Sequence, residues 1–409
     1  MTTPTLQQKI LFHLASLAGG VSGKNPPPDP EAALYQLILD DFQKYQAQIG
    51  TWNVVWGPVV VTYDTFYYPI NALYIAQSGD DPSQYVVSVA GTNPVSFFDW
   101  IIEDALVAKQ IPWPFDEAQG GAISLGTAIG LVILLSSTPS GDRPGAGQTI
   151  RQFLAGLSSK KITLTTGGHS LGGALSPTLG LWLKNTQLLW DPLFQAKFAS
   201  MPTAGPTPGN GAFAEYLSEK IPLVRFWNLL DIVPHAWVET LLAELPTIYA
   251  PDIPSDLSIE YLVQLGEDAA SGGDYTQLCP DSSFPSAVNK SIIHWDWINI
   301  KNYLYQVAYQ HTVAYSDYFA ISGVPADATT LFEPEPVIHS AVIARAASRM
   351  AVPPPPELLA LDPAETDPGQ PITVPVNGVA VPLPATAADP GTDAIATAIQ
   401  AQLDALSAG

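Results

Sequence analysis

The order of apolar and polar positions predicts a chain in which helices and strands alternate. Apolar residues at helical spacing predict a helix over Glu31–Gln48, just after a proline-rich stretch. After residue 50 the period shortens, and β-branched or aromatic runs between turn residues indicate short strands up to residue 89. The elements expected further along are helices 124–135 and 149–157, strand 161–166, helix 174–183, strand 198–203, helix 213–220, strand 223–228 and helix 296–310.

This alternation predicts an α/β fold with a mostly parallel central sheet covered by helices on both faces. We expect an N-terminal helical arm over residues 1–50, a catalytic domain over 51–330, and a Pro/Ala-rich C-terminal extension over 331–409 that ends in a helix. Residues 240–295 show no clear pattern. Five tryptophans are expected in the core: Trp182, Trp190, Trp227, Trp295 and Trp297.

No apolar run approaches the ~20 residues that span a bilayer. We interpret the apolar stretch Ile10–Ala18 as a short helix, with a signal peptide as the alternative.

The chain of 409 residues has 38 acidic against 16 basic side chains, which gives a net charge of −22. This charge argues against binding to nucleic acid and against charge-driven binding to anionic membranes. The single Cys279 cannot form an intrachain disulfide, so the sequence does not decide between a cytoplasmic and a secreted protein.

The strongest chemical signal is the run Gly168-His169-Ser170-Leu171-Gly172. It follows a predicted strand and precedes a predicted helix, which is the context that the G-x-S-x-G nucleophile elbow requires. The sharp turn places the serine oxygen at a helix N-terminus, where backbone dipoles favour developing negative charge. Ser170 is therefore the candidate nucleophile.

A serine hydroxyl needs a base to take its proton and an acid to orient that base. Asp231 follows the predicted strand 223–228 and is the candidate acid, because side chains at that end of a parallel strand face the ligand crevice. Four histidines come after it. We favour His311, which ends the predicted helix 296–310, and keep His294 as the main alternative to it; His235 and His339 are the other two.

An oxyanion hole needs two backbone N–H groups, one of them from the residue after the nucleophile, Leu171. Thr92 is the candidate for the second, since it ends the predicted strand that begins near Val86 and also carries a hydroxyl. A plain turn at Thr92 is the alternative.

Taken together, these motifs resemble the class 3 (fungal-type) lipases over about residues 50–320. The shared features are the stretches 90–92, 99–100, 168–175, 204–213 and 231–234, and His311 followed shortly by aromatic residues. The resemblance implies an α/β-hydrolase fold, a triad of Ser170, Asp231 and His311, oxyanion positions at Thr92 and Leu171, and hydrolysis of lipid esters. It also implies a lid near residues 93–110, for which a fixed core helix is the alternative. The chain departs from the family at Ala90, where arginine is usual, and in its long stretch before His311.

The sequence thus predicts a serine hydrolase that cleaves carboxylic esters of lipid-like substrates, with no cofactor and no metal. Its expected partners are a lipid or small ester and, through the lid, transiently a lipid interface; the oligomeric state is left open. The alternatives are an esterase for short-chain, phenolic or polymeric esters, and a non-catalytic lipase-like protein that binds an acyl ligand.

Overall fold

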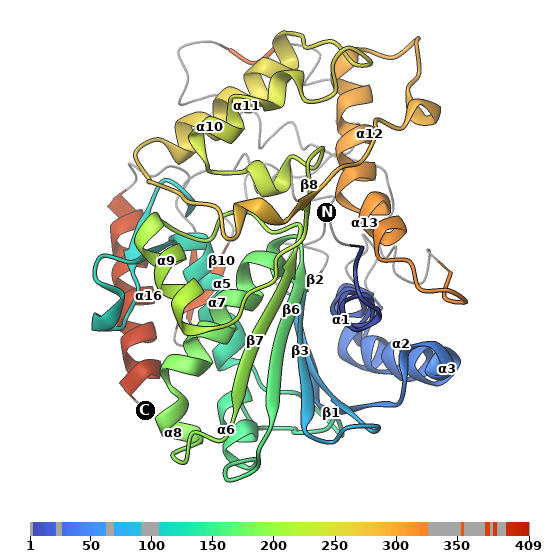
Figure 1. Cartoon of the computed structure of the whole chain (residues 1–409). Coiled ribbons are helices and arrows are strands. Elements are labelled where there is room, and N and C mark those ends of the chain that lie inside the picture. Colours follow the sequence, from blue (N-terminus) through green and yellow to red (C-terminus); the bar gives the residue numbers. More distant parts are fainter. Residues whose placement is uncertain are drawn as a thin grey trace.

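A five-stranded sheet in the order β1-β2-β3-β6-β7 lies at the centre of the molecule (Figure 1). The computed structural model describes residues 3–21, 27–62, 69–90, 106–325, 353–355, 373–376, 379–382 and 390–408. The sheet strands are β1 (Trp52–Thr62), β2 (Pro69–Ser78), β3 (Gln84–Ala90), β6 (Thr163–His169) and β7 (Lys197–Thr203).

The predicted α/β class is confirmed, but the sheet is mixed rather than mostly parallel. β1, β2 and β3 pair antiparallel, whereas β3, β6 and β7 pair parallel. The difference follows from the connections, because a short turn such as residues 79–83 can join only antiparallel neighbours. Parallel strands need a crossover, and β6 and β7 are joined by helix α7 (Leu171–Asn185).

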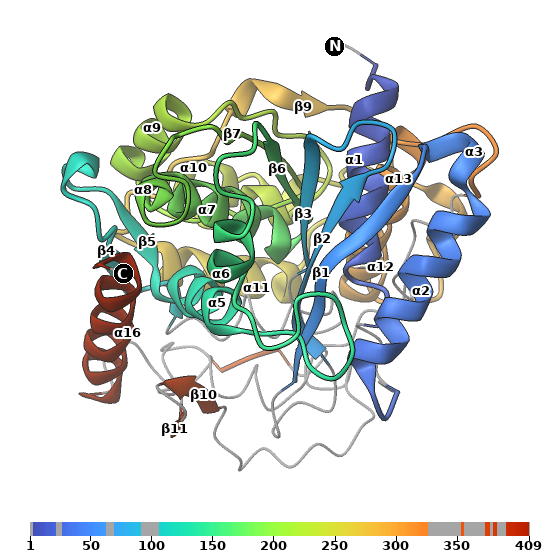
Figure 2. The same cartoon turned by 90° about the horizontal axis from the view of Figure 1, so that it is seen from below.

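Helices cover both faces of this sheet, as the view in Figure 2 shows. On one face lie α1 (Leu6–Leu17) and α2 (Pro30–Lys44), and on the other α5 (Leu125–Ser136) and α7. Neighbouring side chains of a strand point to opposite faces. Tyr74 accordingly packs with the α1 and α2 layer, and Ile75 packs with the α5 and α7 layer.

Above the carboxyl ends of β6 and β7 lies a group of helices that includes α11 and α12 (Figure 1). Its members are α10 (Glu239–Leu242), α11 (Leu257–Ala270), α12 (Asn299–His311) and α13 (Val313–Tyr318). α11 lies in the region where the sequence shows no clear pattern, and its first turn is capped by Asp256. The predicted strand 223–228 contacts β7 only through single β-bridges. It ends in the short strand β8 (Trp227–Asn228), which pairs with β9 (Ser283–Phe284).

The remaining elements are shorter or peripheral. They are α3 (Gln46–Ile49), β4 (Gln110–Pro112), β5 (Ala122–Ser124), α6 (Ile150–Ala155), α8 (Gln187–Trp190), α9 (Gly211–Lys220), β10 (Thr373–Val376) and β11 (Val379–Pro382). None of the helices described combines the length and the apolar character that crossing a bilayer demands.

The C-terminal helix α16 (Pro390–Ala408) packs against α5 and β4. Its apolar stripe, Ile395, Ala396, Ile399 and Leu403, is buried in the same core cluster as α5 and α7. The Lys109 ammonium adds an exposed ion pair to Asp393 at 2.7 Å. α16 therefore completes the layer on the α7 side of the sheet, while the domain limits at residues 50 and 330 stay predictions.

Truncating this stripe is expected to destabilise the whole fold. Leu403 is fully buried, so Leu403→Ala leaves a cavity and is expected to lower the free energy of unfolding by about 2–5 kcal/mol. Urea unfolding followed by circular dichroism measures the change. The matched control is Thr397→Ala, at an exposed position six residues earlier in the same helix, which is expected to stay within about 0.5 kcal/mol of the native protein. Equal stability of the two variants would show that α16 does not contribute to the cooperative core.

Candidate active site

The turn from β6 into α7 holds Ser170 in a strained backbone conformation. Its φ is +60° and its ψ −132°, a region that residues other than glycine rarely adopt. Glycines permit the tight packing around it, because a methyl group at Gly172 would overlap the Val89 carbonyl oxygen. The serine side chain is thereby raised at the edge of the sheet, at the start of α7.

Three side chains far apart in sequence form a continuous hydrogen-bonded chain at this turn. Ser170 Oγ lies 2.8 Å from His311 Nε2, and His311 Nδ1 lies 2.9 Å from Asp231 Oδ2. A carboxylate oxygen can only accept, so His311 carries its proton on Nδ1 and Nε2 is left to accept the serine proton. All three side chains are buried. This is the geometry by which an imidazole can activate a serine.

Asp231 is held by several donors in a fully buried position. Besides the imidazole, the Tyr315 hydroxyl donates to Oδ2 at 2.9 Å, and the Val233 N–H donates to Oδ1 at 3.1 Å. Tyr315 also accepts the Asn228 N–H, so it ties the loop of Asp231 to α13. A buried carboxylate with three donors keeps its orientation, and with it the orientation of His311.

His169, next to the nucleophile, braces the backbone of the candidate base. Its Nε2 donates to the His311 carbonyl oxygen at 2.7 Å, and its Nδ1 lies 3.1 Å from Thr203 Oγ1. Burial, reinforced by the neighbouring His311, lowers the pKa of His169 well below its usual range. Burial also lowers the pKa of His235, although its Nδ1 donates to the Asp231 carbonyl oxygen.

These two neutral imidazoles predict a loss of stability in mild acid. The pKa of each is lower in the folded than in the unfolded state, so below the unfolded value of 6.5 the unfolded chain binds more protons. The free energy of unfolding therefore falls as pH decreases from about 6.5 to 5, by about 1.4 kcal/mol per pH unit for each proton taken up.

Urea titrations at several pH values test this. His169→Asn is expected to flatten the slope, because it removes one of the titrating groups. Thr203→Val removes the hydrogen bond to His169 Nδ1 but no titrating group, and is expected to lower stability while leaving the slope unchanged. Equal slopes in the two variants would exclude His169 as a source of the pH dependence.

The other predicted residues fall in different places. Leu171 is the first residue of α7, so its N–H belongs to the helix turn that lacks internal acceptors. Thr92 and most of the expected lid, residues 93–105, lie outside the described residues, as does His339. His294 is exposed on the surface, where its ring stacks on Trp297.

Trp182, Trp190 and Trp227 are buried as expected, whereas the prediction for Trp295 is wrong because its side chain is 91% exposed.

Sequence reasoning did not assign roles to Tyr315 and to the imidazole of His169. A signal for Tyr315 exists: it lies four residues after His311, among the aromatic residues that follow this histidine. No comparable signal marks the bond from His169 to the His311 carbonyl, because it depends on how α12 docks against β6. Among the described residues no group of three or more acidic, histidine or cysteine side chains is placed to hold a metal ion.

Comparison with known proteins points to lipases. The family described as lipase (class 3) matches residues 86–240. The crystal structure of M37 lipase is similar over 81% of this chain and 96% of its own, with a TM-score of 0.72 and 29% identity. Lipase II from Rhizopus niveus covers 58% of this chain and 77% of its own, with a TM-score of 0.41 and 17% identity. A search of curated protein sequences gave no significant match.

The sheet, the elbow after β6 and the hydrogen-bonded Ser–His–Asp chain define an α/β-hydrolase. Within it, residues 86–240 match the class 3 lipase family. The candidate active site includes residues beyond that stretch, because His311 belongs to α12, outside the matched residues.

Proposed function

We propose that this protein hydrolyses carboxylic esters of lipid-like substrates through an acyl-enzyme on Ser170. The observation that carries the proposal is the continuous chain from Ser170 Oγ through His311 to the buried Asp231 carboxylate, at the elbow of a class 3 lipase domain. The similarity to M37 lipase over 81% of this chain supports the same reaction class.

In the first half-reaction Ser170 Oγ attacks the ester carbonyl carbon while His311 Nε2 takes the hydroxyl proton. Negative charge then develops on the carbonyl oxygen, where the Leu171 N–H and the Thr92 N–H stabilise it. The imidazolium, held by Asp231, donates its proton to the departing alcohol oxygen, and the acyl group remains on Ser170.

The second half-reaction repeats these steps with water. His311 takes a proton from the water as its oxygen attacks the acyl carbon, and the carboxylic acid leaves as Ser170 regains its proton. No redox change occurs and no co-reactant is required. Tyr315 and His169 position this machinery, because one holds the Asp231 carboxylate and the other holds the His311 backbone.

Turnover of p-nitrophenyl esters from acetyl to palmitoyl tests the proposal. A preference for long acyl chains supports a lipase, and a preference for acetyl or butyryl esters would indicate the short-chain esterase instead. Absence of turnover for every ester, with binding of a fatty acid retained, would indicate the non-catalytic alternative. The lid near residues 93–110 remains part of the proposal, and predicts a rise in rate once a long-chain ester exceeds its solubility.

A further inference from the structure

The loop between β9 and α12 presents a tryptophan to solvent. In this segment, residues 289–298, here called the tryptophan loop, Trp295 is 91% exposed and Ile298 44% exposed. Most large aromatic side chains are largely buried, and an exposed one adds apolar area that has no partner within the fold. At 91%, Trp295 is the most exposed large hydrophobic side chain among the described residues.

This loop is firmly held. The side-chain amide of Asn302 accepts the His294 N–H and donates to the His294 carbonyl oxygen, both at 2.9 Å. Gln306, one turn further along α12, pairs in the same way with Asn289, at 3.1 and 2.6 Å. Two side-chain amides thus pair with the loop backbone much as a neighbouring strand would. They fix the part of the loop that precedes Trp295 in the sequence.

Aromatic stacking fixes the other side of Trp295. The Trp297 ring stacks on His294 with centroids 4.0 Å apart, and the Lys301 ammonium lies 3.8 Å from the Trp297 centroid. The backbone N–H of Trp297 also donates to the His294 carbonyl oxygen. The ordering entropy of the loop is therefore lost during folding rather than on contact with a partner, which favours binding through Trp295.

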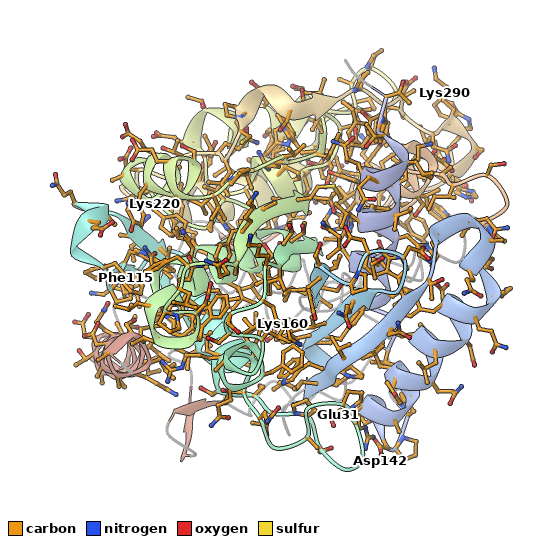
Figure 3. The ribbon with its side chains drawn as sticks, turned by 60° about the horizontal axis from the view of Figure 1, so that its bottom comes forward. Glu31, Phe115, Asp142, Lys160, Lys220 and Lys290 are labelled. Atoms are coloured by element: carbon orange, nitrogen blue, oxygen red, sulfur yellow. The ribbon has the colours of Figure 1, made fainter. Side chains whose placement is uncertain are left out.

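The position of the loop relates it to the candidate active site. α12 carries the tryptophan loop at its first residue and His311 at its last, about 20 Å apart for a helix of 13 residues. α12 stands beyond the carboxyl ends of β6 and β7, the edge at which Ser170 lies (Figure 1). Lys290, within the loop, projects at the rim of the molecule (Figure 3).

The charged side chains of the loop and of the first turn of α12 are of both signs. Lys290 pairs with Asp252 at 2.8 Å, and the loop residue Asp296 and the helix residue Lys301 carry one charge of each sign. The chain as a whole carries a net charge of −22. This patch is thus suited to an uncharged or zwitterionic surface, which a strongly acidic protein can approach with less repulsion than an anionic one.

We propose that Trp295 inserts into the headgroup region of a neutral or zwitterionic lipid surface and docks the protein there, with the N-terminal end of α12 facing the lipid. The choice of lipid as the occupant rests on the proposed function. A tryptophan beside lysines is the combination that settles at the boundary between water and acyl chains. A second copy of the chain is disfavoured because one tryptophan offers at most about 250 Å², against about 800 Å² per partner in a stable interface.

Cosedimentation of the full chain with dioleoylphosphatidylcholine vesicles tests this docking. Trp295→Ala is expected to lower the partition coefficient about tenfold or more, whereas Trp295→Phe retains most of the binding. The matched control is Phe194→Ala, which removes an aromatic side chain that is 57% exposed. Phe194 follows α8, and Figure 1 shows α8 at the end of the molecule opposite α12. It is expected to bind vesicles like the native protein.

Kinetics separate docking from chemistry. In Trp295→Ala, turnover of a water-soluble short-chain ester is expected to stay unchanged, which also shows that the variant is folded, while turnover of a long-chain ester dispersed in the vesicles falls in proportion to binding. Native-like vesicle binding by Trp295→Ala would overturn the proposal. So would self-association of the native protein that Trp295→Ala abolishes without any change in vesicle binding. Binding that depends on Trp295 in a protein without ester turnover would support docking and contradict the proposed function.

Discussion

Ser170→Ala is expected to reduce ester turnover by about 10⁴–10⁶-fold. The alanine variant retains the α7 elbow, because alanine fits the backbone space of serine and lacks only the oxygen. The loss is expected because Ser170 Oγ is the nucleophilic atom, hydrogen-bonded to His311 Nε2 at 2.8 Å. The measurement is kcat on a p-nitrophenyl ester, with circular dichroism to verify folding.

The buried hydroxyl of Ser176, six residues further along the chain in α7, provides the matched control. Ser176→Ala is expected to keep kcat near the native value, since that side chain does not belong to the hydrogen-bonded chain of Ser170. Retention of more than about a hundredth of the native rate by Ser170→Ala would contradict the acyl-enzyme mechanism.

His311→Ala is expected to be as inactive as Ser170→Ala. Without the imidazole no group accepts the serine proton, and the Asp231 carboxylate loses the partner that it orients. The double variant Ser170→Ala/His311→Ala is expected to lose little more than either single variant, because members of a triad act as a unit. Steady-state kinetics of the three variants measure this non-additivity.

His294→Ala is the control for this experiment, because the sequence offered His294 as the main alternative base. Its ring is exposed and stacks on Trp297, at the far end of α12 from His311. It is expected to keep kcat on a water-soluble ester. An inactive His294→Ala beside an active His311→Ala would reverse the assignment of the base.

The parts of the site that could be predicted from sequence are those with a local pattern. The elbow is a short motif between a strand and a helix, and β6, α7 and β7 lie within a few residues of their expected bounds. The antiparallel direction of β1, β2 and β3 could not be read from periodicity, because an apolar run has the same pattern in either direction.

Contacts between distant segments were beyond sequence reasoning where no motif pointed to them. The bond from Tyr315 to Asp231 depends on the docking of α13 beside the loop after β8. Trp295 was expected in the core because large aromatic residues usually pack there. The loop that carries it is held against α12 by the amides of Asn302 and Gln306, and nothing in the spacing of those residues reveals these contacts.

Covalent trapping tests the central claim most directly. An alkyl p-nitrophenyl phosphonate reacts with an activated serine and releases nitrophenol, so one phosphonyl group per chain should appear in the intact mass. Peptide mass spectrometry is expected to place it on Ser170 in the native protein and to find no labelling in His311→Ala. A label on any other residue, or continued ester hydrolysis by a protein labelled fully at Ser170, would contradict the account.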